Sequence, residues 1–303
     1  MGIQLHGILL IDKTLGSLKK DRSQTQIVDW GNSYIKPSAI KWIKENNPQF
    51  SDYEKTKIRM PESHSEAWVA GDFLKLLGYK YLAIDLNGKE DSLPIDLRED
   101  ITHYPNKKLT HLTSIQNFVH NAKKSSDNVA LEKIINYADF IIDCGTSEHV
   151  DNQYHNWKNQ FNMLKEGGIS LNILPAKGYW DIHCKYKYTI EFFQQFIELC
   201  NYETTILGYT EPIENRMDIV CTLRKTSNSK FPTEEEFNKL PIHIEEGVAF
   251  NDRVLYTYAY DSKQMLELQQ FVKDQGGNYK GITNLTSNEA TAWRKQQLNE
   301  NYK

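Results

Sequence analysis

The sequence lacks the features that mark secreted, membrane-spanning and zinc-binding proteins. It has four cysteines, Cys144, Cys184, Cys200 and Cys221, and no Cys-x-x-Cys pair, so we interpret them as free thiols. No His-Glu-x-x-His motif occurs, and we expect no metal site. No apolar run approaches the roughly 20 residues of a membrane span, and the N-terminus lacks the pattern of a signal peptide. These absences predict a soluble, cytoplasmic protein.

Excess positive charge is also missing. Lysine and arginine number 36 against 40 aspartates and glutamates, a net charge of −4, so no overall field attracts nucleic acid or an anionic membrane surface. Lys177, Lys185 and Lys187 stand among aromatic residues near 179–188, but this local group is no concentrated basic groove. We therefore expect neither nucleic acid nor membrane as a partner.

Short apolar runs alternate with amphipathic segments through most of the chain. From Ser65, apolar residues recur every three or four positions up to Gly78, as in a helix with a glycine at its end. Other strand-like runs follow helical stretches or stand near the end of the regular part, at 81–84, 138–143, 169–174, 203–209 and 217–224. This alternation predicts a doubly wound, mostly parallel α/β sheet with an antiparallel edge. Val28, Ile84, Ile142 and Ile173 are expected on its buried strands.

The chain divides by composition into a main domain and a C-terminal appendage. We assign residues 1–230 to the main domain and read the polar stretch 35–62 as a helical insertion outside the core. Residues 231–303 form the predicted α/β appendage, which begins with Thr233 as a helix N-cap before three acids. Less regular segments are read as helices at 113–122, 128–137 and 265–272, and as a strand at 254–260.

Two strand ends carry candidate cofactor contacts. Asp85 follows an apolar strand, where an acid can accept hydrogen bonds from the hydroxyls of a ribose; the alternative is an exposed loop aspartate. The Gly-x-Gly-x-x-Gly motif is absent, and Gly31 and Asn32 stand in its place after the first strand. Asp85 lies 54 positions beyond Gly31 where roughly 20 is usual, a gap that an insertion at 35–62 explains.

The segment from Asp143 to Val150 is the strongest local signal. It leaves an apolar strand and supplies small residues together with Glu148 and His149, a carboxylate and an imidazole suited to general-base chemistry near neutral pH. Because adjacent side chains on a helix do not face each other, Glu148 need not orient His149. The alternative is a helix-capping turn with Thr146 or Ser147 as the cap.

These residues resemble a group of Rossmann-fold S-adenosylmethionine-dependent methyltransferases of the class I type. Asp143–Val150 is similar to their "D-x-G-T-S-E-H-V" motif, and the downstream Lys165, Gly167–Gly168 and Leu174–Pro175 are similar to their "K-x-G-G" and "L-P". The segment 183–188 resembles "H-G-x-Y-x-Y", with Cys184 in place of the glycine. The likeness covers about residues 65–224 and implies a seven-stranded methyltransferase-like sheet.

The resemblance also implies roles for individual residues. Those implied to bind S-adenosylmethionine are Gly31 and Asn32 beside its methionine part, Asp85 and Leu86 at the ribose, Asp96 near the adenine, and Asp143, Cys144 and Gly145 beside the reactive methyl. If the acceptor holds a proton, His149 is the first choice as general base and His183 the second, with Glu148 as a third catalytic candidate.

The leading hypothesis is thus a methyltransferase that acts on a small-molecule or glycan-like acceptor. A nicotinamide-dependent oxidoreductase is a second possibility, because a strand that ends in aspartate also suits that cofactor and Tyr-x-x-x-Lys spacings occur at 53–57 and 154–158. A third is a non-catalytic binding or scaffold protein on a degenerate methyltransferase fold, as the weak Gly31 motif allows.

Overall fold

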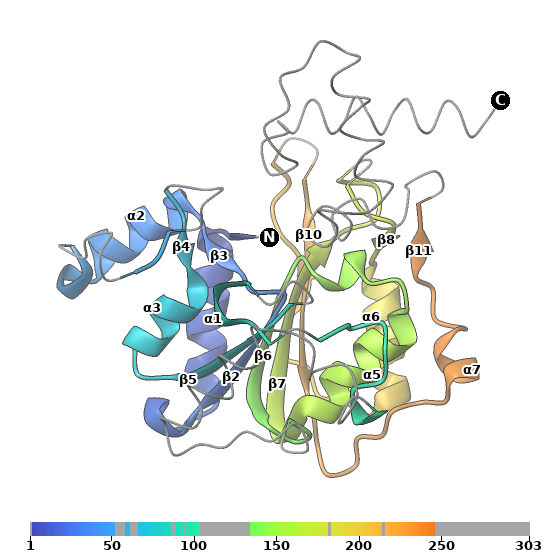
Figure 1. Cartoon of the computed structure of the whole chain (residues 1–303). Helices are drawn as coiled ribbons and strands as arrows, with labels where there is room; N and C mark the ends of the chain where they lie inside the picture. Colours follow the sequence, from blue (N-terminus) through green and yellow to red (C-terminus); the bar gives the residue numbers. More distant parts are fainter. Residues whose placement is uncertain are drawn as a thin grey trace, which may run out of the picture.

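A six-stranded central sheet organises the computed structural model (Figure 1), which describes residues 2–51, 58–60, 66–85, 89–93, 95–103, 134–180, 183–213 and 216–245. In spatial order its strands are β5 (Lys80–Ile84), β2 (Gln26–Trp30), β6 (Ala138–Cys144), β7 (Leu164–Pro175), β10 (Asp218–Arg224) and β9 (Leu207–Tyr209). β5, β2, β6 and β7 pair in parallel, and β10 is antiparallel to both of its neighbours. The predicted mostly parallel sheet with an antiparallel strand near one edge is confirmed.

The described residues provide six strands for this sheet, not the seven that we expected. Beyond β5, Leu93 makes one isolated parallel bridge to Ile84, and no further ladder follows in the part of the chain that the structure describes. The next residue, Pro94, has no main-chain N–H to donate to a ladder. The four marker residues do lie on strands of the sheet and are buried, as predicted: Val28, Ile84, Ile142 and Ile173.

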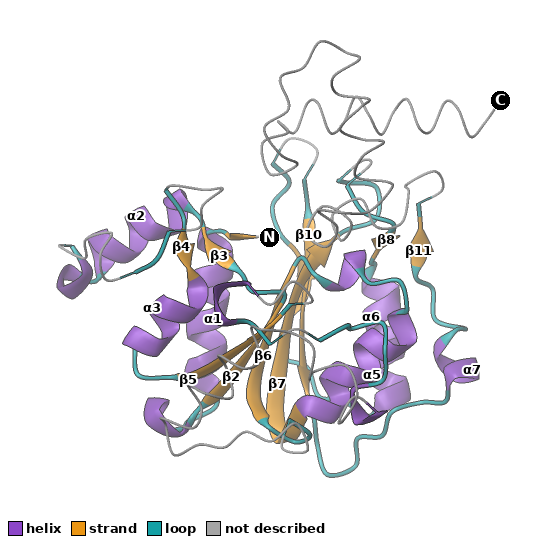
Figure 2. Ribbon diagram, in the orientation of Figure 1, coloured by secondary structure: helices purple, strands orange, loops and turns teal. Residues whose placement is uncertain are grey.

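Helices cover both faces of the sheet (Figure 2). They are α1 (Leu5–Ser17), α2 (Pro37–Asn46), α3 (Ala70–Leu76), α5 (Gln153–Met163), α6 (Ile190–Cys200) and the short α7 (Glu234–Phe237). Successive strand residues point to opposite faces, so Phe140 packs in the cluster that includes α1, whereas Ile141 packs in a cluster on the other face. Both faces are therefore apolar, which explains why the strand sequences read as continuous hydrophobic runs. Within the described residues, no helix has the length and apolar character that crossing a bilayer requires.

The described part of the stretch 35–62 contains α2 and a 3₁₀ turn at Pro48–Phe50, as the predicted helical character implies, but our interpretation that the stretch lies outside the core is wrong. Ala39 and Ile43 of α2 are buried in the same cluster as α1. Small strands anchor this segment: β3 (Tyr34–Ile35) lies between β1 (Gly2–Ile3) and β4 (Trp68–Val69) in a three-stranded sheet. The few apolar residues of α2 recur at helical spacing, so they form one narrow buried stripe on an otherwise polar helix.

Two other predicted boundaries shift. The sequence predicts a helix that stops at Gly167–Gly168. That helix ends at Met163 and β7 begins at Leu164, so that Gly167 lies inside the strand with φ +79°. The predicted helix from Ser65 begins at Ala70, because Trp68 and Val69 pair as β4. Gly78 does follow the helix in the left-handed conformation expected there.

Residues 231–245 pack closely on the main body. Thr233 caps α7 in a reciprocal capping box with Glu236, as the sequence indicated, and Phe237 is buried among the aromatic side chains of α5 and α6. β11 (His243–Ile244) pairs with β8 (Tyr186–Lys187). The predicted strand 254–260, the helices at 113–122 and 265–272, and most of that at 128–137 lie outside the described residues. The division at residue 230 remains a prediction.

Candidate functional site

The carboxyl ends of three parallel strands meet at one edge of the central sheet. β2 lies between β5 and β6; its last residue, Trp30, pairs with Ile84 of β5. Gly31 donates its N–H to the carbonyl oxygen of Ile84 at 2.7 Å, so Gly31 and Asp85 follow directly on adjacent strands. The chain runs from β2 to β5 on one side and then to β6 on the other. This edge is therefore a topological switch point, where open α/β sheets bind ligands.

Asp29 shapes the turn after β2, a role that we did not predict from the sequence. Its carboxylate accepts hydrogen bonds from the N–H of Ser33 at 2.6 Å and from the hydroxyl of Tyr81 at 2.5 Å. Burial raises the pKa of Asp29 despite these donors. Gly31 and Asn32 follow Asp29 in this turn, and both have a left-handed backbone conformation, with φ +105° and +51°. The turn thus brings main chain, rather than bulky side chains, to the switch point.

A hydrogen-bond chain joins the ends of β2 and β6. The Thr146 hydroxyl donates to the carbonyl oxygen of Trp30, and the Trp30 indole N–H donates to Asn156 Oδ1 at 2.9 Å. The capping alternative proposed Thr146 or Ser147 as the cap of the following turn. The Thr146 side chain makes no capping hydrogen bond to that turn. The cap of α5 is Asn152, which accepts from the N–H of His155.

The Asp143 carboxylate is buried and engaged by its own surroundings. Ser147 Oγ and Gln160 Nε2, the latter at 2.9 Å, donate to its Oδ2, and the N–H groups of Thr146 and Ser147 donate to its Oδ1. Burial raises its pKa to about 6. This side chain therefore holds the turn after β6 against α5, and Gly145 in that turn is left-handed, with φ +88°.

Glu148 and His149 lie on a 3₁₀ turn, η7 (Ser147–His149), directly above this network. Gln153 clamps the turn through hydrogen bonds to the carbonyl oxygens of Ser147 and Val150, both 2.7 Å. Glu148 Oε1 lies 3.5 Å from His149 Nε2. Our expectation that adjacent residues would not face each other is wrong here: the two long side chains bend toward each other from a single short turn, although one 3₁₀ step separates them by about 120°.

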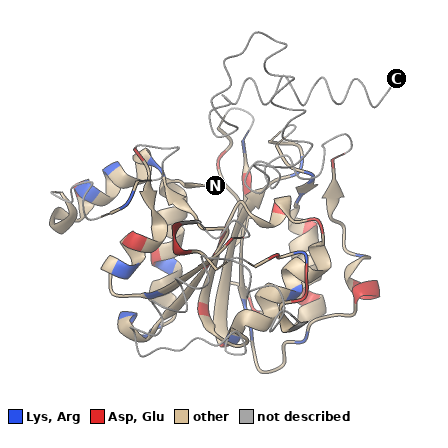
Figure 3. Ribbon diagram, in the orientation of Figure 1, with Lys and Arg blue, Asp and Glu red and all other residues tan. Residues whose placement is uncertain are grey.

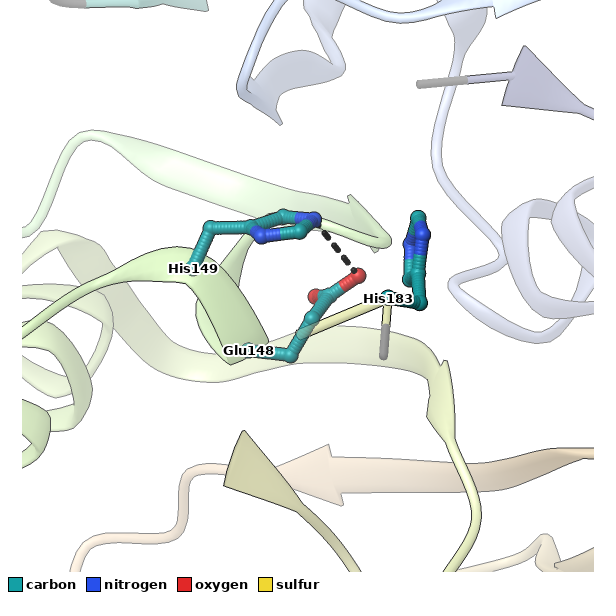
Figure 4. A group of neighbouring side chains, drawn as sticks. All are labelled: Glu148, His149 and His183. Atoms are coloured by element: carbon teal, nitrogen blue, oxygen red, sulfur yellow. Dashed lines mark ion pairs between the residues drawn. The ribbon is translucent and has the colours of Figure 1, made fainter. Parts of the chain in front are cut away.

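His183 joins this pair from a different part of the chain (Figure 4). Its ring centroid is 5.1 Å from that of His149, with the two planes 73° apart. On its other side His183 contacts Trp180, at 4.8 Å between ring centroids. The Trp180 indole N–H donates to Asp218 Oδ1 at 2.9 Å and to the Met217 carbonyl oxygen. All three predicted catalytic residues therefore meet beside the switch point.

The other residues predicted to bind the cofactor differ in burial and in their contacts. Asp85 is half-buried at the end of β5, as expected of a residue that can reach a ligand. Asp96 is buried, and Arg98 holds its carboxylate at 2.6 Å through Nη2 and 2.8 Å through Nε. Burial raises the pKa of the Cys144 thiol well above its ordinary value, which favours the neutral thiol over the thiolate. Leu86 lies outside the described residues.

Polar residues of α5 support the site, and a sequence signal for them exists. The helix buries six residues, and four of them are spaced at i, i+3, i+4 and i+7, namely Gln153, Asn156, Trp157 and Gln160. Three amides on a helix face that also carries a buried tryptophan are unusual unless they are hydrogen-bonded. Trp157, Phe161 and Leu164 predict this helix from the sequence, but we had not assigned its amides a function.

Comparisons with known proteins give structural likeness alone. No family model matches the sequence, and no curated protein matches it. The chain is similar to the crystal structure of the MccD protein, at 10% identity over 72% of this chain and 96% of that one, with a TM-score of 0.39. A SAM-dependent methyltransferase from Archaeoglobus fulgidus is 11% identical over 73% of this chain and 96% of its own, with a TM-score of 0.35.

A third structure is 1,6-didemethyltoxoflavin-N1-methyltransferase from Burkholderia thailandensis, with 1,6-didemethyltoxoflavin and S-adenosylhomocysteine bound. It is 9% identical over 73% of this chain and 89% of its own, with a TM-score of 0.34. The strand order and the switch point of this chain are evident in its own structure. The fold that they show is a doubly wound, mostly parallel α/β sheet with one antiparallel strand, β10.

Proposed function

We propose that this protein is an S-adenosylmethionine-dependent methyltransferase whose acceptor is a small molecule or a glycan-like compound. The observation that carries the proposal is the meeting of three features at one sheet edge: the left-handed turn at Gly31, the acid Asp85 after the neighbouring strand, and the Glu148–His149–His183 cluster after β6. This edge of the sheet therefore offers contacts for a nucleoside-containing cofactor and side chains that can accept a proton.

The residues at the switch point fit the proposed cofactor. Gly31, Asn32 and Gly145 bring main chain close to the crevice, and Asp85 is partly exposed beside them. A charged acceptor of two ribose hydroxyls is a strong hydrogen-bonding partner. For Asp96 we propose a main-chain contact near the adenine, because Arg98 holds its carboxylate.

The catalytic residues would act on the acceptor. The cofactor's sulfonium supplies an already activated methyl group, so the protein has to hold an acceptor oxygen in line with it and remove the proton. His149 is the first candidate to take that proton and His183 the second. Glu148 faces His149 Nε2 and would stabilise the imidazolium that results.

The distribution of charge fits a small acceptor better than a polyanion. Lysines and arginines are dispersed among acidic positions over the described elements in Figure 3.

The Tyr-x-x-x-Lys spacing at Tyr154 and Lys158 has a structural explanation. Tyr154 donates to the Pro232 carbonyl oxygen at 3.4 Å, and Lys158 pairs with Asp100 at 2.8 Å. Neither observation supports the oxidoreductase alternative.

Ligand binding tests the proposal directly. S-adenosylmethionine and S-adenosylhomocysteine should raise the melting temperature of the full chain, and NAD should leave it unchanged, because a ligand that binds only the native state stabilises it. Stabilisation by NAD alone, or by none of the three, would contradict the proposal. Release of S-adenosylhomocysteine in the presence of hydroxyl-bearing acceptors then separates an enzyme from a non-catalytic binding protein.

A further inference from the structure

Three metal-ligating side chains converge although no sequence motif links them. Glu148, His149 and His183 each present one ligand atom, and these atoms all lie within 4.8 Å of one another. Figure 4 shows Glu148 and His149 rising from one turn, with the His183 ring facing them from another segment. Our expectation of no metal site relied on local spacing, which cannot detect a third ligand 34 residues further along the chain.

The geometry suits ligands that share one ion. Two ligand atoms at about 2.1 Å from a tetrahedral metal ion lie about 3.4 Å apart. Glu148 Oε1 and His149 Nε2 are 3.5 Å apart, so one ion can contact both with little movement. The two imidazole planes are 73° apart, which lets both rings aim a nitrogen at a common point without stacking on each other.

The burial and the charges of the three side chains also favour a bound metal ion. Glu148 is 1% exposed and lies beside His149, and buried charges in proteins are either paired or coordinate metals. A divalent cation would meet one carboxylate and two neutral imidazoles, which leaves a net charge of +1 at the site. Three protein ligands also leave at least one coordination position open, as in catalytic rather than structural metal sites.

The surroundings hold the ligands in place. Gln153 fixes the turn that carries Glu148 and His149 through its two hydrogen bonds to main-chain oxygens. On the other side, Trp180 contacts His183 while Asp218 holds the Trp180 indole. Such support of the ligands is what a metal site requires beyond the ligands themselves.

From these observations we infer that Glu148, His149 and His183 form a binding site for a divalent transition-metal ion of the zinc type, with an open position for an oxygen of the acceptor. Imidazole and carboxylate ligands favour such ions over Mg²⁺, which prefers oxygen ligands alone. Metal binding itself does not depend on the proposed function.

The role of the metal does rest on the proposed methyl transfer. A hydroxyl bound to the ion loses its proton to solvent more readily, because a divalent ion lowers the pKa of a bound oxygen. The resulting alkoxide or phenolate would attack the methyl carbon, the carbon–sulfur bond would break with its electron pair going to sulfur, and the products would be a methyl ether and a neutral thioether. The acceptor class is therefore a compound with a metal-coordinating hydroxyl. When the ion is bound, His149 and His183 serve as its ligands, and solvent takes the proton that one of them would accept in the metal-free site.

Isothermal titration calorimetry with Zn²⁺ tests the site in the full chain without a histidine tag. We expect binding of one Zn²⁺ per chain, with much weaker binding of Mg²⁺. Glu148→Gln and His183→Ala should each weaken Zn²⁺ binding at least tenfold. His155→Gln is the matched control, because His155 lies on α5 with Nδ1 2.8 Å from the Arg98 carbonyl oxygen and should leave the affinity unchanged.

The visible spectrum of the Co²⁺-loaded protein gives a second readout, since it should report coordination by nitrogen in wild type and change in His183→Ala. Circular dichroism of the metal-free variants checks that they fold. The inference is overturned if wild type does not bind Zn²⁺, or if folded Glu148→Gln and His183→Ala bind it as wild type does.

S-adenosylmethionine binding is measured in parallel. If Zn²⁺ binds at the cluster and the cofactor does not bind, the proposed function fails while the metal site stands; the reverse result removes only the metal site.

Discussion

The Thr146 hydroxyl donates a hydrogen bond to the carbonyl oxygen of Trp30, and so joins the ends of β6 and β2 across the switch point. The two turns that border the candidate cofactor site are therefore one connected unit. Trp30 extends the connection to α5 through its indole N–H and Asn156. A disturbance at this bond should be felt in both stability and ligand binding.

Thr146→Val should test this connection. The substitution preserves shape but leaves the Trp30 carbonyl oxygen without this donor in a buried place, which costs about 1–3 kcal/mol. Urea denaturation should show a loss of unfolding free energy of this size, and calorimetry should show weaker binding of S-adenosylmethionine. Thr146→Ser keeps the hydroxyl and should stay close to wild type. Equal stability of the valine and serine variants would show that the bond contributes nothing.

Asp85→Ala should weaken binding of S-adenosylmethionine. A charge-assisted hydrogen bond to ribose hydroxyls contributes about 1.5–3 kcal/mol, so we expect the dissociation constant to rise at least tenfold in calorimetry. Asp91→Ala is the control, because Asp91 is a nearby acid whose side chain is mostly exposed. Unchanged affinity in Asp85→Ala would remove Asp85 from the site.

Asp143 predicts a pH dependence of stability with a defined sign. Burial raises its pKa in the folded state from 3.8 to about 6, so the folded protein binds a proton there that the unfolded chain has released. The contribution of Asp143 to stability is therefore present at low pH and is lost as the pH rises from about 4 to about 6. At about 1.4 kcal/mol for each tenfold change in proton affinity, the loss amounts to roughly 3 kcal/mol.

Asp143→Asn isolates this effect, because asparagine does not titrate. The unfolding free energy of wild type minus that of the variant, measured by urea denaturation at pH 4.5, 5.5 and 6.5, should fall as the pH rises. Other carboxylates, such as Asp100 with its lowered pKa of about 2, contribute equally to both proteins and cancel. A difference that is constant over this range would contradict the raised pKa of Asp143.

His149→Ala should slow methyl transfer about 10²–10⁴-fold with little change in cofactor affinity. This loss is expected whether His149 accepts the proton or holds the metal ion. The measurement is turnover of S-adenosylmethionine with a hydroxyl-bearing acceptor, alongside calorimetry of cofactor binding, and His155→Gln serves as the control. Full turnover in His149→Ala would leave the turn after β6 as a wall of the cofactor site and nothing more.

The amino-acid sequence by itself determined the main strands of the central sheet and their carboxyl ends. Short apolar runs such as 81–84 and 138–143 are buried on both faces, so their composition alone marks them. The residues after them, Asp85 and Asp143 to Gly145, were correctly placed at strand ends for the same reason. The helix before Gly78 and the cap at Thr233 were also readable, because periodicity and capping are local properties.

Only the tertiary structure decided what these residues contact. The sequence motif around Asp143 is the same whether its carboxylate faces a ligand or Gln160. The packing of α5 beside β6 decides that it faces Gln160. The stretch 35–62 was read as peripheral because its composition is polar, yet Ile43 is buried in the core through one narrow stripe of α2. His183 lies beside Glu148 and His149 because β7 is parallel to β6, so that the segments after both strands are at the same edge of the sheet. Contacts between segments distant in the sequence follow from the folding of the sheet, and no local pattern encodes them.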